Sequence, residues 1–137
     1  MLAQLLWIFA SVVILLLAVA HLYYTFFTNK FSIRNAEVEE GMKNSYPNLT
    51  KKTTVWKAWI GFNGSHSSGI IFMALINMYL AIAQYELLQL SFFIQGLTLV
   101  TSLFLLFLGK KYWFNIPYKG ALLSFVCYLI AVVLMWW

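Results

Sequence analysis

Four long apolar stretches dominate this chain, and each is long enough to cross a lipid bilayer as a helix. They cover residues 2–28, 59–84, 87–109 and 118–137. The first three contain no Asp, Glu, Lys or Arg, and the fourth contains only Lys119, near its start. About 20 apolar residues span the hydrocarbon layer as a helix, and the backbone in lipid must satisfy its hydrogen bonds within its own segment. The pattern predicts an all-α, polytopic transmembrane four-helix bundle that forms a single membrane domain.

The composition excludes several other classes of protein. Hydrophobic residues make up 63% of the chain and charged residues only 9%, against about 25% charged residues in an ordinary soluble domain. A soluble domain of this size exposes too much of its surface to hide so many apolar side chains. We therefore exclude a soluble globular domain, a disordered segment and a nucleic-acid-binding module. The single cysteine excludes a disulfide framework and a cysteine-rich metal site.

The basic residues predict the orientation of the spans. All nine lie either in residues 29–58 or in residues 110–119. Since cytoplasmic loops are enriched in Lys and Arg, both segments are expected to be cytoplasmic and both termini to lie outside. The first segment is then a cytoplasmic loop of about 30 residues, in which Asn35 can cap a short helix. Trp7 is expected in the outer aromatic belt.

Each span carries polar residues at helical spacing. Polar groups are costly in lipid unless they find partners, so these residues should face the interior of the bundle. Counting along each span from its cytoplasmic end places one polar residue per helix at a similar depth, and these include the only two histidines. The four residues are His21, His66, Ser102 and Ser124. Ser11, Asn77 and Gln95 form a second, neutral layer nearer the outside.

The beginning of the second span is the least lipid-like part of any span. Residues 61–69 are rich in glycine, serine and asparagine, and Gly61, Ser65 and Gly69 recur every four residues. A mostly apolar pocket with a few convergent polar groups is typical of a ligand site. We predict such a site for a lipophilic ligand or a lipid headgroup, with aromatic walls. Its residues are His21, His66, Asn63, Thr25, Ser102, Ser124 and Tyr128.

The same histidines allow other interpretations. Two imidazoles can hold a b-type haem or contribute to a metal site, or they can bond only to each other and to Asn63 and fix the helix register. We assign no catalytic residues, because neither a nucleophile nor a carboxylate partner accompanies the histidines. An accessory or assembly subunit of a larger membrane complex is a further alternative. The expected partners are the lipid bilayer and, as alternatives, other membrane proteins or a second copy.

Two sequence motifs carry a resemblance to a known group of proteins. One is His21-Leu22-Tyr23-Tyr24-Thr25, and the other is Trp59-Ile60-Gly61-Phe62-Asn63-Gly64-Ser65-His66-Ser67-Ser68-Gly69. With these motifs the chain resembles a family of short, uncharacterised four-span bacterial membrane proteins. The resemblance covers nearly the whole chain. It implies a multi-pass protein of the bacterial cytoplasmic (inner) membrane and brings no established activity with it.

Overall fold

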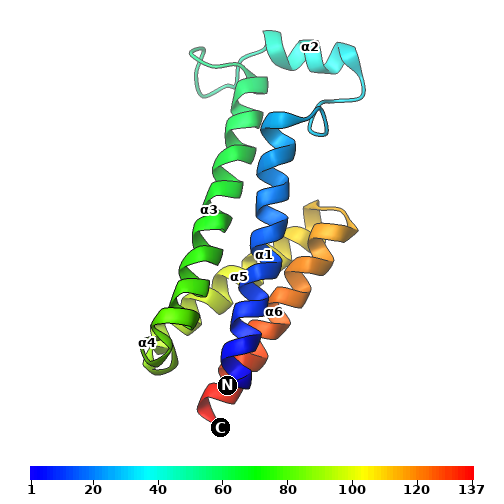
Figure 1. Ribbon diagram of the computed structural model, residues 1–137. Coiled ribbons are helices and arrows are strands. Elements are labelled where there is room, and N and C mark those ends of the chain that lie inside the picture. The colour runs from blue at the N-terminus through cyan, green and yellow to red at the C-terminus, as the bar shows by residue number, and fades with distance from the viewer. The chain divides into compact units, whose positions relative to one another are not determined.

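The computed structural model describes all residues, 1–137, and contains six helices and no strand (Figure 1). Four of the helices are long and apolar enough to cross a membrane, which confirms the all-α prediction and indicates a multi-pass membrane protein. In chain order the helices are α1 (Leu2–Phe27), α2 (Ala36–Asn44), α3 (Val55–Ala83), α4 (Tyr85–Leu90), α5 (Phe92–Tyr112) and α6 (Asn115–Trp136).

The helix boundaries differ from the predicted spans at one place that matters. The third span was expected to begin at residue 87, but residues 85–90 form the separate short helix α4. Ser91 then takes an extended backbone conformation, and its side chain accepts a hydrogen bond from the backbone N–H of Ile94. A serine in this position satisfies an otherwise unpaired N–H of the first turn. The membrane helix α5 therefore starts at Phe92.

The chain divides into two compact units. The first unit contains residues 1–17 and 70–137, and the second contains residues 18–69. The helices α1 and α3 each contribute one part to each unit. The first unit thus holds parts of all four long helices, whereas the second holds the end of α1, the connecting segment with α2, and the beginning of α3.

The interior of the first unit combines many small and polar side chains with a few large ones, such as Trp7, Leu88 and Tyr128. Buried residues recur every three or four positions along each helix, while large apolar side chains such as Phe72, Phe93 and Val100 are exposed. Small and polar residues at helix contacts, with bulky apolar residues facing outward, are typical of helices packed in lipid. The burial confirms that the predicted polar stripes face inward. The buried polar residues of this unit are Ser11, Asn77, Gln95, Thr98, Ser102 and Ser124.

Asn77 joins three helices of the first unit. Its side-chain oxygen accepts hydrogen bonds from the indole N–H of Trp7 at 3.1 Å and from the hydroxyl of Thr98 at 2.9 Å. Trp7 is fully buried, so its assignment to an interfacial aromatic belt is wrong. The belt rule fails here because the indole N–H has a partner inside the protein and does not need the headgroup layer.

Gln95 fastens the ends of α4, α5 and α6. Its amide nitrogen donates to the carbonyl oxygens of Leu88 and Gln89, at 2.8 and 2.9 Å. Its amide oxygen accepts from the indole N–H of Trp136 at 2.8 Å, and the Trp136 ring stacks on Phe92. Every buried side-chain nitrogen and oxygen in the chain has a hydrogen-bond partner. The hydrogen bonds within the protein therefore explain the neutral layer of Ser11, Asn77 and Gln95 without a ligand.

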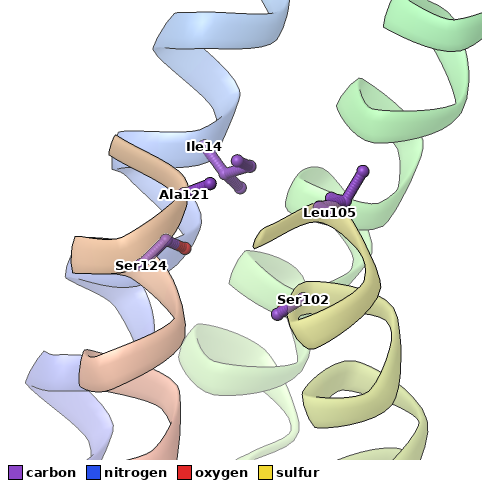
Figure 2. Close-up of a pocket in the computed structure, with 5 residues that line it drawn as sticks. All are labelled: Ile14, Ser102, Leu105, Ala121 and Ser124. Atoms are coloured by element: carbon purple, nitrogen blue, oxygen red, sulfur yellow. The ribbon is translucent and has the colours of Figure 1, made fainter. Parts of the chain in front are cut away.

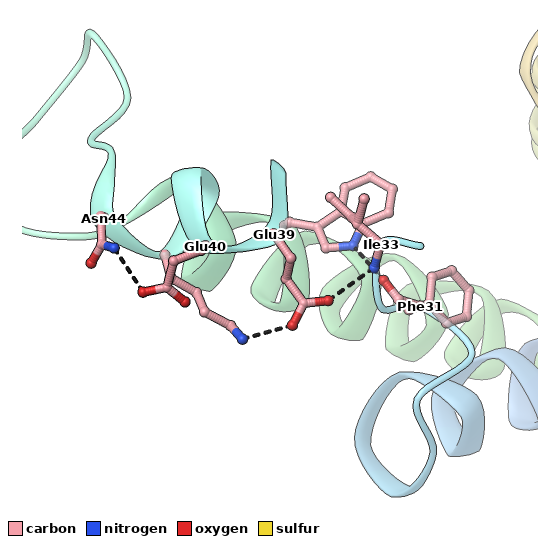
Figure 3. Close-up of polar contacts among 7 residues, drawn as sticks. Phe31, Ile33, Glu39, Glu40 and Asn44 are labelled. Carbon is pink, nitrogen blue, oxygen red and sulfur yellow. Dashed lines mark hydrogen bonds and ion pairs between the residues drawn. The ribbon is translucent and has the colours of Figure 1, made fainter. Parts of the chain in front are cut away.

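In the second unit, α2 is held by capping contacts. Asn35 caps it as expected, since its side-chain oxygen accepts from the backbone N–H of Glu37 at 3.0 Å. The carboxylate of Glu39 accepts from Lys43 at 2.6 Å and from the backbone N–H of Ile33 at 3.0 Å (Figure 3). The hydrogen bond from Lys43, followed by that from Ile33, lowers the pKa of Glu39 below its ordinary value. These contacts fold the linker before α2 back onto the helix.

Candidate functional site

The centre of the candidate site is a hydrogen bond between α1 and α3. The imidazole Nε2 of His21 lies 3.0 Å from the side-chain oxygen of Asn63. The amide nitrogen of Asn63 donates to the carbonyl oxygen of Trp59 at 2.8 Å, which orients the amide so that its oxygen faces the histidine. Because an amide oxygen can only accept, neutral His21 must carry its proton on Nε2. Asn63 therefore fixes both the position and the tautomer of His21.

Three ring contacts link the two histidines to each other and to their aromatic neighbours. The ring centroids of His21 and His66 lie 5.7 Å apart, nearly edge to face. Phe31 packs on His21 at 4.6 Å, and Phe62 lies almost parallel to His66 at 6.0 Å. The indole N–H of Trp59 donates to the carbonyl oxygen of Phe31 at 3.4 Å and holds that segment against α3 (Figure 3). The two histidines thus belong to one aromatic cluster within the second unit.

Phe31 is the member of this cluster that the sequence did not reveal. It lies in the connecting segment just beyond α1, where no helical spacing relates it to His21. An aromatic residue within a polar loop is the only signal it leaves.

Thr25 lies beside the histidine but plays a structural part. Its side chain is buried, and its hydroxyl donates to the carbonyl oxygen of His21, one turn earlier, at 2.8 Å. Ser67 makes the corresponding bond to the carbonyl oxygen of Asn63. Both hydroxyls therefore donate their hydrogen bond to a carbonyl oxygen of their own helix, and each could only accept a hydrogen bond from a ligand.

Gly64 allows α1 and α3 to approach within the second unit. A Cβ atom at this position would lie 2.8 Å from the ring of Phe26, which is closer than van der Waals contact allows. The neighbouring Gly61 has open space around it. Of these two glycines, only Gly64 is required by the packing of the helix pair that carries the histidines.

The second unit carries an excess of positive charge in addition to the cluster formed by His21, His66, Phe31 and Phe62, here called the histidine cluster. Lys43 forms the one salt bridge of the chain, with Glu39. The ammonium group of Lys30 lies 4.6 Å above the ring of Tyr24. The helix α1, which carries Tyr24, contains no acidic residue. The remaining basic residues of the unit are Arg34, Lys51, Lys52 and Lys57, and none forms an ion pair with a carboxylate.

The other three predicted site residues lie in the first unit. Ser102 donates to the carbonyl oxygen of Thr98 at 2.7 Å, and Ser124 donates to that of Ala10 at 2.9 Å. Both serines face a crevice between helices that is too narrow to hold a water molecule (Figure 2). The crevice is completed by Ile14, Leu105 and Ala121.

Tyr128 also has its partners inside the first unit. Its hydroxyl forms a 2.8 Å hydrogen bond with the hydroxyl of Ser11, and its ring meets the Trp7 ring edge to face at 4.8 Å. The structure therefore brings His21, His66, Asn63 and Thr25 together and gives Tyr128 a place in a different polar cluster.

The side chains around the histidines form a poor set of metal ligands. No three residues among His, Cys, Asp and Glu gather closely enough to hold a metal ion. His21 already uses Nε2, one of its two nitrogens able to bind a metal, in the contact with Asn63. The observed geometry is a hydrogen-bonded histidine–asparagine pair with aromatic neighbours.

Searches against protein-family models, curated proteins and solved structures found no match to this chain.

Proposed function

We propose that this chain is a multi-pass membrane protein that binds the polar head of a lipophilic ligand at the histidine cluster of the second unit. The observation that carries the proposal is the orientation of His21 by Asn63, with the His66 ring 5.7 Å away. With its Nε2–H donated to Asn63, neutral His21 keeps Nδ1 as an oriented acceptor, and an oriented polar group flanked by aromatic rings matches the composition of small-molecule sites. The ligand head touches His21 and His66, and its apolar part lies along exposed rings such as Phe62.

The charge of the second unit favours an anionic head. Basic residues near a membrane surface attract anionic groups by about 1 kcal/mol each. In the proposed orientation, with both termini outside, residues 29–58 face the cytoplasmic leaflet of a bacterial inner membrane. A lipid with a phosphate head therefore suits this unit better than a cationic lipid does.

The test compares what co-purifies with the full chain and with Asn63→Leu. Both proteins are isolated from native membranes in mild detergent, and bound lipids are extracted and identified by mass spectrometry. We expect one lipophilic species to be reduced about tenfold in the variant, the effect of losing roughly one oriented hydrogen bond. Ser68→Ala, at an exposed position of the same helix, is the matched control. Identical lipid profiles for the parent and Asn63→Leu would refute ligand binding at this site.

One observation favours a second candidate, an accessory subunit of a larger membrane complex. Of the four candidate spans, α3 has the lowest mean hydropathy and also the smallest buried share. Gly61 and Gly69 on this helix have nothing within 4 Å of a Cβ position. A partner helix could approach closely there. In the same preparation, a second membrane protein in stoichiometric amount supports this candidate, and isolation of the chain alone opposes it.

A haem-binding function has no comparable support from the geometry. The purified sample still reports on it, because a haem held by two histidines gives an intense Soret band. Absence of that band from a preparation made in haem-supplied cells would remove this alternative.

A further inference from the structure

A second hollow, in the first unit, lies outside the histidine cluster. It has a volume of about 400 Å³ and is open to the surroundings. Its lining residues are Phe107, Lys110 and Lys111, which are spaced three and four positions apart and therefore share one face of α5. The hollow lies at the last turns of a membrane helix, where a bilayer changes from hydrocarbon to headgroups.

The two ammonium groups at this hollow have no anionic partner in the protein. All acidic residues of the chain are glutamates at positions 37, 39, 40 and 86, and the one salt bridge joins Glu39 to Lys43. Lys111 is also held in place by rings, since its nitrogen lies 5.2 Å from the Tyr112 centroid and 5.9 Å from that of Phe107. A positioned cation without a counter-ion is a ready site for an external anion.

An apolar path continues from the hollow along α5. Phe107 and Phe104, one turn apart, are both more than half exposed, and their rings stack with centroids 6.3 Å apart. The same side of the helix therefore offers two cations at its end and aromatic rings below them. This order of groups matches a phospholipid, with its phosphate at the end of the helix and its acyl chain along the span.

We propose that this face of α5 binds an anionic phospholipid. The phosphate lies between Lys110 and Lys111, and one acyl chain packs on Phe107 and Phe104. The helix dipole also favours lysines at the carboxyl end of a helix. That effect explains the two positive charges, but it does not explain the hollow or the exposed aromatic rings beside them. The proposal does not depend on the histidine site, which lies in the other unit.

Native mass spectrometry of the full chain tests the proposal. The probes are palmitoyl-oleoyl phosphatidylglycerol and palmitoyl-oleoyl phosphatidylcholine, added separately to the delipidated protein in detergent. We expect the parent to prefer phosphatidylglycerol. Lys110→Gln/Lys111→Gln should weaken phosphatidylglycerol binding about tenfold or more and weaken the binding of phosphatidylcholine, whose choline ammonium balances its phosphate charge, by a smaller factor. Phe104→Ala/Phe107→Ala should weaken the binding of both lipids.

A matched control removes the same charge elsewhere. Lys51→Gln/Lys52→Gln changes two exposed lysines of the second unit and should leave phosphatidylglycerol binding within about twofold of the parent. An equal loss in this control would overturn the proposal, because net charge rather than a site would then explain binding. Unchanged phosphatidylglycerol binding in Lys110→Gln/Lys111→Gln would overturn it as well.

Discussion

At the scale of single residues, buried side-chain amides form key hydrogen bonds between the helices of this protein. Asn77 and Gln95 each link three helices of the first unit, and Asn63 orients His21 in the second. A side-chain amide can donate and accept at once, so it can bond to its own helix while receiving a donor from another. In lipid, where few other partners exist, that property makes a single amide a junction.

Substitution of Asn77 tests this role. Asn77→Leu keeps the approximate volume but leaves the indole N–H of Trp7 and the hydroxyl of Thr98 without their acceptor. We expect a loss of about 1–2 kcal/mol in the free energy of unfolding, measured by SDS titration in mixed micelles with circular dichroism. Ile76→Leu, at the neighbouring half-exposed position, should cost less than about 0.5 kcal/mol. A variant Asn77→Leu as stable as the parent would show that the junction contributes nothing.

At the scale of helices, α1 and α3 of the second unit meet where Phe26 covers Gly64. A Cβ atom at Gly64 would lie 2.8 Å from the Phe26 ring, so that ring would have to shift. The same helix pair carries His21, Asn63 and His66. Close packing at Gly64 and the hydrogen bond at Asn63 are therefore two parts of one interface, and disturbing the first should weaken the second.

Gly64→Val and Gly61→Val form a matched pair for this interface. Both replace a glycine of α3 by the same residue, so the change in helix propensity is the same, but only Gly64→Val meets the Phe26 ring. We expect Gly64→Val to lower stability by about 1–3 kcal/mol relative to Gly61→Val, measured by the same SDS titration. Adding Phe26→Ala should restore most of the loss. Equal stability of the two glycine variants would contradict the proposed close approach.

At the scale of the whole molecule, an even number of spans predicts that both chain ends lie on one side of a membrane, and the structure has four candidate spans. Figure 1 shows the two ends near each other at one end of the first unit. The distribution of lysines and arginines predicts that this side is the outside. In that orientation, the proposed sites at His21 and at Lys110 would both bind lipids of the cytoplasmic leaflet.

Cysteine labelling in intact cells tests this orientation. In a Cys127→Ala background, which removes the buried native thiol, single cysteines replace the exposed residues Leu49 and Glu86. We expect a membrane-impermeant maleimide to label Glu86→Cys in intact cells and Leu49→Cys only after permeabilisation. The reverse pattern would invert the topology and place the histidine cluster at the outer leaflet. Labelling of both positions in intact cells would contradict the four-span arrangement.

The sequence by itself determined the four apolar helices and the inward direction of their polar residues. Both are local properties: the length of an apolar run sets a span, and the helical period assigns Thr98 and Ser102 to one face. It also predicted the cap at Asn35, because capping needs only neighbouring backbone groups. The contact of His21 with Asn63 followed less directly, from two residues near the ends of consecutive helices.

Only the tertiary structure decided which polar residues meet. Ser102, Ser124 and Tyr128 have their partners in the first unit, and Phe31 joins the histidines from a loop. These outcomes rest on contacts between residues far apart in the sequence, such as Ser124 with Ala10 and Trp59 with Phe31. Residue spacing along one helix carries no information about its displacement along another.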